Sequence, residues 1–228
     1  MLYENAVSPE LLELIIKLQG DITFKDYILS GGTALSLQLG HRKSIDIDLF
    51  TPNKQNNQKL IRFFQDNFSS YNLVYIDTYI LQLIVRNISI DMVSINQNIL
   101  EKPKTENGIT LFGIKDIAAM KLRAVMLRNK PKDYIDIVYL LQEIPLASMF
   151  DLYKQKFNTD DTFLLKKTLA ESDDIEKPEW QKVEMLNNNI NIYEIPEILK
   201  NELAKYNAKH GIIRKLSLPG KIKKLFNR

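Results

Sequence analysis

The hydrophobic pattern of this chain changes its period near residue 105, and that change limits the folds open to it. Before it, apolar and polar residues alternate along 73–77, 79–86 and 88–95, as in β-strands. After it, apolar residues recur about every three to four positions, first along 114–128, as in amphipathic helices. The sequence therefore predicts an α+β protein, with a mixed sheet in the N-terminal half and a helical bundle in the C-terminal half.

Within each half, residues typical of helix and strand ends predict where the individual elements begin and end. Ser8 followed by Pro9 predicts a helix start. Residues 27–29 predict a short strand that leads into a loop at 30–33. Further helices are predicted at 34–39, 60–68, 134–144, 146–157, 162–170, 180–187 and 196–206. Because residues 101–108 are polar and contain a proline, we expect a linker there, between domains 1–105 and 106–228.

Composition excludes several kinds of protein. The chain has no cysteine, which excludes disulfide scaffolds, cysteine-bound zinc and thiol catalysis, and only two histidines, His41 and His210. No apolar run reaches the roughly 18 residues of a membrane span, and the acidic start is unlike a signal peptide. We therefore expect a cytoplasmic protein with no membrane partner. The net charge of +3 is too small to indicate nucleic acid by itself.

One group of residues has the composition and spacing of a catalytic site. Gly31-Gly32-Thr33 is followed, after twelve residues, by Asp46-Ile47-Asp48 on a predicted strand, 44–50. Two aspartates at i and i+2 point to the same side of a strand and offer the hard oxygen ligands that Mg²⁺ prefers. Glycines let the backbone approach phosphates, and Thr33 adds a hydroxyl. Asp91, on the polar face of another predicted strand, supplies a third carboxylate. Each part alone is more often a turn or a solvated face, but the combination predicts metal-dependent phosphoryl transfer.

The segments 30–50 and 116–137 together resemble the AbiEii/AbiGii-type nucleotidyltransferase family, within the DNA polymerase β-like superfamily. Several members are toxins of type IV toxin–antitoxin or phage-defence systems. The resemblance covers about residues 25–142 and implies a polymerase β-like fold for the N-terminal domain. It implies metal binding by Asp46 and Asp48 and nucleotide binding by Gly31, Gly32, Thr33, Arg42, Ser44 and Lys121. Asp133 and Asp136 match the acidic pair of the family's last motif.

The charged residues of the second segment, 116–137, can each be interpreted in more than one way. Lys121 and Arg128 are seven residues apart, on one helical face and about 10 Å apart, a spacing that suits a triphosphate or a solvated basic face. Asp133 either joins the site or stabilises a helix N-terminus. Asp136 falls on an inward face and needs a cationic partner, so it either supports the site or takes part in it. His41, next to Arg42, either contacts phosphate or lies on the surface of its loop, and the surface position is expected.

The prediction is a nucleotidyltransferase that moves a nucleoside monophosphate from an NTP to an acceptor, and the family resemblance implies that this acceptor is a tRNA or a protein. Asp46, Asp48 and Asp91 would hold two Mg²⁺ ions, or Mn²⁺, and Asp91 would take a proton from the acceptor hydroxyl. A cognate antitoxin would be a partner, and the basic tail from Lys215 would approach RNA or remain solvated. Two alternatives stay open: a small-molecule transferase of the antibiotic-modifying type, and a non-catalytic nucleotide- or partner-binding module.

Overall fold

The strands of this protein form one sheet that runs through both expected domains. A computed structural model describes the backbone of residues 1–217 and the side chains of residues 1–210. Within that part of the chain the sheet has seven strands, in the order β3-β4-β5-β2-β1-β7-β6. They are β1 (Ile28–Leu29), β2 (Ile47–Thr51), β3 (Asn72–Ile76), β4 (Ile80–Val85), β5 (Ile88–Ser94), β6 (Lys104–Glu106) and β7 (Ile109–Leu111). β2 lies parallel to β5 and β1 parallel to β7, so the sheet is mixed as predicted.

The hairpin β4–β5 follows the predicted alternation. Arg86 and Asn87 have positive φ, as a tight two-residue hairpin turn requires. Along β5, Ile88, Ile90 and Met92 are buried, and Asp91 points to the other, more open face. This confirms the predicted face for Asp91.

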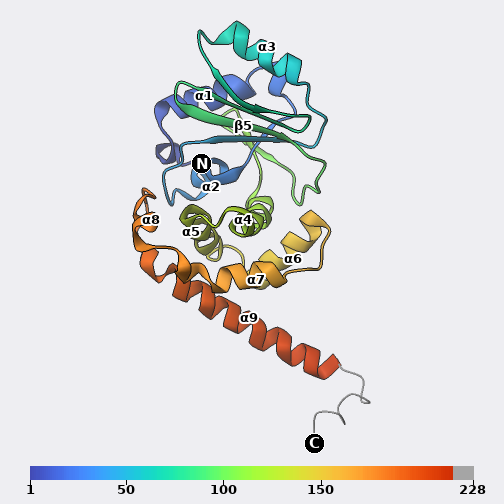
Figure 1. The fold of residues 1–228 in the computed structure, drawn as a ribbon, viewed down its shortest axis with the longest axis vertical. Coiled ribbons are helices and arrows are strands. Elements are labelled where there is room, and N and C mark those ends of the chain that lie inside the picture. The colour runs from blue at the N-terminus through green and yellow to red at the C-terminus, as the bar shows by residue number, and fades with distance from the viewer. Residues whose placement is uncertain (218–228) are drawn as a thin grey trace, which may run out of the picture.

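Helices cover both faces of the sheet (Figure 1). α1 (Pro9–Gln19) and α3 (Asn57–Asn67) lie on one face. Ser8 caps α1 by accepting a hydrogen bond of 3.2 Å from the amide of Leu11, which confirms the predicted start. α2 (Gly31–Leu39) lies on the other face, and beyond it lie α4 (Ile114–Arg128) and α5 (Pro131–Leu140).

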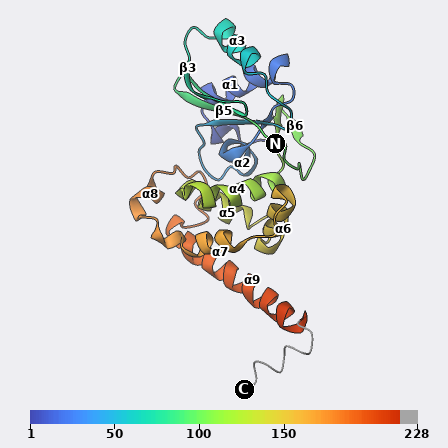
Figure 2. The ribbon, with the colours of Figure 1, turned by 45° about the vertical axis from the view of Figure 1, so that its right-hand side comes forward.

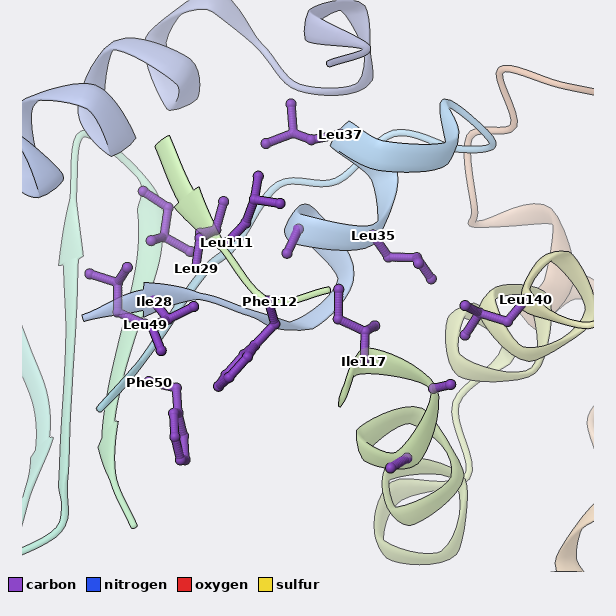
Figure 3. Close-up of a cluster of buried hydrophobic side chains, with 14 of the residues drawn as sticks. Ile28, Leu29, Leu35, Leu37, Leu49, Phe50, Leu111, Phe112, Ile117 and Leu140 are labelled. Atoms are coloured by element: carbon purple, nitrogen blue, oxygen red, sulfur yellow. The ribbon is translucent and has the colours of Figure 1, made fainter. Parts of the chain in front are cut away.

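The core is continuous from the sheet into the helical half (Figure 3). Leu29 and Leu49 come from the sheet, Leu35 from α2, Ile117 from α4 and Leu140 from α5, and all are buried. Burying an aliphatic side chain of this size contributes about 1.5–3 kcal/mol. The helical half is therefore packed directly on the α/β half.

The C-terminal half is helical, as predicted. Its α-helices are α4 (Ile114–Arg128), α5 (Pro131–Leu140), α6 (Leu146–Phe157), α7 (Phe163–Ala170), α8 (Lys177–Gln181) and α9 (Ile195–Ser217). Short 3₁₀ helices occur at Glu4–Ala6, Ile22–Phe24, Ser172–Asp174 and Ile192–Glu194. α9 extends away from the body (Figure 2). Across residues 1–217, no helix combines the length and apolarity that crossing a membrane requires. The basic tail lies outside the described side chains.

Several predicted boundaries are wrong. β2, α3 and α5 begin at Ile47, Asn57 and Pro131 instead of 44, 60 and 134, and α9 ends at Ser217 instead of 206. The expected linker 101–108 contains β6, which pairs with β7, because Ile109 and Leu111 are buried and extend the sheet past β1. The division into domains at residue 105 stays a prediction, but it falls within the sheet. α2 begins at Gly31, three residues before the predicted start at 34, and α8 ends at Gln181 instead of continuing to 187.

Candidate active site

Three polar side chains lie in one row across the sheet. β2 and β5 are paired so that Asp48 lies opposite Asp91, and β5 and β4 so that Asp91 lies opposite Gln82. The Gln82 amide donates a hydrogen bond of 3.1 Å to Oδ2 of Asp91. Asp46 precedes the first residue of β2. The register therefore brings Asp48 and Asp91 side by side on the more open face.

This concentration of negative charge changes the acidity of the carboxyls. Burial raises the pKa of Asp48, and the charges of Asp91 and Asp46 raise it further. Burial also raises the pKa of Asp91, although its hydrogen bond from Gln82 acts in the opposite direction. Neighbouring carboxylates that disfavour each other's ionised form are the electrostatic setting that a divalent cation relieves.

The start of α2 touches Asp48. The amide of Ser30 donates a hydrogen bond of 2.8 Å to the carbonyl oxygen of Asp48. Gly31 has φ +68°, and a Cβ atom there would lie 1.9 Å from Oδ2 of Asp48. Only glycine allows this approach, which sets the N-terminus of a helix beside the carboxylate. Exposed amides and the helix dipole make such a position favourable for a phosphate.

Thr33 and Ser44 lie behind this surface. Both are buried, and their hydroxyls are hydrogen-bonded at 2.8 Å. Thr33 also donates to the carbonyl oxygen of Asp46. The hydroxyls thus fasten α2 to the start of β2. Their predicted contact with nucleotide stays a prediction.

A cavity of about 370 Å³ lies between part of the sheet and part of α4. Ser30, Gly31 and Asp48 line it on one side, and Lys121 and Arg128 line it on the other. Apolar residues of β5, the segment just after it, α4 and α6 add to the walls: Val93, Ile95, Met120, Leu127 and Phe157. The cavity thus combines carboxylate, helix N-terminus and cations with an apolar surface, as a nucleotide site does.

Lys121 is more deeply buried than expected. Its side chain is 2% exposed, and its ammonium lies 3.0 Å from Asp133 and 2.6 Å from Asp136. Arg128 makes two hydrogen bonds of 2.7 Å to Asp133. Lys121 therefore lines the cavity from within an ion-pair network. Its predicted contact with a triphosphate stays a prediction.

Asp136 joins this network to the loop before β2. Its carboxylate accepts hydrogen bonds from Arg42 at 2.7 and 2.9 Å, and it lies 2.8 Å from Nε2 of His41. The predicted surface position of His41 is wrong, because the ring is fully buried against Asp136 and Tyr139. Arg42 is also buried and bound to a carboxylate.

The cations keep both acidic residues ionised. Burial alone would raise the pKa of Asp136, but Arg42 and Lys121 hold it well below its usual value. At Asp133, burial raises the pKa of the carboxyl, whereas Lys121 and Arg128 lower it, and the pKa is lowered overall. Paired, hydrogen-bonded carboxylates of this kind support the arrangement of their neighbours.

Lys132 is a site residue that the sequence analysis passed over. Its ammonium lies 3.2 Å from Oδ2 of Asp46, and both side chains are 38% exposed. The only signal in the sequence was its place beside Asp133. Among the described residues, no three acidic or histidine side chains are gathered as a metal site requires. The donor set of Asp46, Asp48 and Asp91 nevertheless fits a divalent cation in its chemistry.

Comparison with known proteins identifies the family of the chain. The family described as the nucleotidyl transferase AbiEii toxin of a type IV toxin–antitoxin system matches residues 18–188. Protein aq_aa25 of Aquifex aeolicus (strain VF5) is 31% identical over 187 residues, 77% of this chain and 89% of that protein.

Two solved structures share the fold. JHP933 of Helicobacter pylori has a TM-score of 0.54 at 17% identity, over 94% of this chain and 100% of that chain. MenT4, the nucleotidyltransferase toxin Rv2826c of Mycobacterium tuberculosis H37Rv, has a TM-score of 0.58 at 12% identity, over 94% and 84%. At these identities the likeness shows the fold alone, but the family match extends over most of the chain, including the row of carboxylates. The chain belongs to the AbiEii nucleotidyltransferase toxin family.

Proposed function

We propose that this nucleotidyltransferase moves a nucleoside monophosphate from an NTP to a hydroxyl group of a tRNA or a protein, in a metal-dependent reaction. The acceptor oxygen forms a bond to the α-phosphorus, the bond from that phosphorus to the bridging oxygen breaks, and pyrophosphate leaves. The outcome in the cell would be the arrest of growth, relieved by a cognate antitoxin.

Asp46, Asp48 and Asp91 would hold divalent cations, Mg²⁺ or Mn²⁺. Such ions neutralise charge on the phosphates and activate the attacking oxygen. The amides at the start of α2, with Gly31 and Gly32, would bind the phosphates of the NTP. Lys121 and Arg128, across the cavity, would offset the negative charge of the triphosphate. Asp91 would accept the proton of the acceptor hydroxyl, a role that its raised pKa favours.

The observation that supports this proposal best is the contact between Gly31 and Asp48. It brings the start of α2 and the Asp48 carboxylate together at one wall of one cavity, where they would bind phosphate and metal. A protein that only binds nucleotide has no need of carboxylates beside the phosphates, because they repel one another. The arrangement is therefore more useful to an enzyme than to a binding module.

The test uses each of the four NTPs, labelled on the α-phosphate, with Mg²⁺ and a total cell extract. We expect the label to move to RNA or to protein with one preferred NTP, together with the release of pyrophosphate. Asp48→Asn serves as the inactive control. Label on a small molecule alone would support the antibiotic-type alternative, and no labelled product with any NTP would contradict the proposal.

A further inference from the structure

A second cleft, of about 190 Å³, is lined by Asp46. Asp46, Lys132, Lys43 from the loop before β2, Lys182 from the end of α8 and the acidic Glu184 all line it. The cleft shares no residue with the larger cavity. Asp46 lies at its border, whereas Asp48 faces the larger cavity.

The walls of this cleft are fixed by backbone pairing. The amide of Lys43 donates a hydrogen bond of 2.8 Å to the carbonyl of Glu184. Arg42 forms an isolated antiparallel bridge with Met185. These contacts hold the segment after α8 against the loop before β2. The cleft is therefore built by both halves of the chain.

The three lysines of this cleft differ in the ion pairs that they form. The ammonium of Lys43 has no partner among the residues whose side chains the structure describes. Lys182 is exposed, and within the described part of the chain it pairs only with Glu179, three residues earlier on the surface, where solvent weakens such a pair. Lys132 is held by Asp46. Two cations are thus available to an anion as the cleft stands, and the third is engaged by a carboxylate of the candidate metal site.

A cation on Asp46 would change this distribution. An ammonium and a divalent ion cannot both neutralise the same carboxylate oxygen, and the ion carries the larger charge. Lys132 is at the second position of α5, exposed enough to turn without unfolding its helix. Released from Asp46, its ammonium has the cleft beside it.

We propose that this cleft is a phosphate-binding subsite formed by Lys43, Lys182 and Lys132, of which Lys132 becomes available only when a metal ion replaces it on Asp46. The proposal rests on the proposed function for the metal-binding role of Asp46. The phosphate would belong either to the NTP or pyrophosphate, or to the backbone of a nucleic-acid acceptor. Metal and phosphate would bind cooperatively, because each removes a competitor of the other.

The first measurement is Mn²⁺ binding to the full chain without any phosphate ligand. Lys132→Ala should bind Mn²⁺ roughly 3- to 10-fold more tightly than the wild type, since a competing charge is removed. Lys130→Ala, an exposed lysine two residues earlier that does not line the cleft, should leave Mn²⁺ affinity unchanged. Asp46→Asn tests the proposed function separately. If it binds Mn²⁺ as the wild type does, the metal assignment of Asp46 fails, whatever Lys132 does.

The second measurement is binding of inorganic pyrophosphate and of a short single-stranded RNA, each with and without Mg²⁺. Lys43→Ala should weaken one of the two probes about 5-fold under both conditions. Lys132→Ala should weaken the same probe by a similar factor with Mg²⁺ but not without it. The affected probe identifies the source of the phosphate. The subsite is refuted if neither probe responds to Lys43→Ala, or if the effect of Lys132→Ala is independent of Mg²⁺.

Discussion

At the scale of single residues, the two glycines of the Gly31-Gly32 pair have different contacts. A Cβ atom at Gly31 would meet the Asp48 carboxylate, whereas one at Gly32 would lie 2.4 Å from Nη2 of Arg42. Arg42 in turn holds Asp136. The same short segment therefore sets the position of a candidate metal ligand and of the buried ion-pair network behind it.

Gly31→Ala should abolish nucleotide transfer, because the new methyl group displaces the Asp48 carboxylate. The matched control is Gly108→Ala, since Gly108 also has positive φ but a methyl group there would meet nothing within 4 Å. Both variants should lose about 1 kcal/mol of folding free energy to backbone strain. Only Gly31→Ala should lose transfer in the labelled-NTP assay. Full activity in Gly31→Ala would contradict the close contact.

Asp48→Asn should reduce transfer at least about 100-fold while raising the melting temperature of the metal-free protein at neutral pH. The pKa of Asp48 is raised above its ordinary value of 3.8, so its ionised form costs folding free energy once the pH exceeds that value. The gain from asparagine should therefore be largest at neutral pH and disappear as the pH falls below about 4. A gain independent of pH would contradict the raised pKa.

The alternation of polar and apolar residues was enough to predict which face Asp48 and Asp91 occupy. It could not predict their register, which depends on the pairing of β2 with β5. Nor could it predict the contact of Lys132 with Asp46, which joins residues 86 positions apart. Local periodicity predicts on which face of a strand a side chain lies. The partner of that side chain on a distant segment depends on how the elements pack, which periodicity does not predict.

At the scale of elements, α4 is another case in which the sequence predicts the element but not the surroundings of its side chains. Its bounds were predicted correctly from apolar periodicity. The surroundings of Lys121 were not, because they depend on α5, whose Asp133 and Asp136 enclose the ammonium. A lysine on a helical face looks solvated until the neighbouring helix supplies buried carboxylates.

Lys121→Met should destabilise the protein by about 3–5 kcal/mol, because it leaves a buried network short of one cation. Lys156→Met is the matched control, since Lys156 is fully buried against Asp116 at 2.6 Å but does not line the cavity. Both should lower the urea midpoint by similar amounts. Only Lys121→Met should also weaken NTP binding, by roughly 10- to 150-fold. Equal NTP affinity in the two variants would leave Lys121 a purely structural role.

At the scale of the whole molecule, the two halves are joined at the loop that carries His41 and Arg42. Asp136 of α5 accepts hydrogen bonds from this loop, and the carbonyl of His41 accepts them from the amides of Leu186 and Asn187. The partners lie more than 90 positions apart for Asp136, so the sequence could not reveal them. The candidate site lies at this joint, which makes its geometry depend on both halves.

The buried contacts of Asp136 at this loop should make the free energy of unfolding depend on pH in the acid range. The pKa of Asp136 is held well below 3.8 in the folded protein, so its stabilising contribution is complete above that value and is lost as the pH falls toward the lowered pKa. Asp136→Asn should already be about 3–5 kcal/mol less stable at neutral pH, because Arg42 and Lys121 keep their buried charges without it. Between neutral pH and about pH 3 the wild type should therefore lose more stability than the variant, measured as urea midpoints over a pH series. Asp151→Asn, which removes a 68% exposed carboxylate on α6, should follow the wild-type curve. Parallel curves for the wild type and Asp136→Asn would mean that another group carries the acid sensitivity, and the joint would then be held by packing alone.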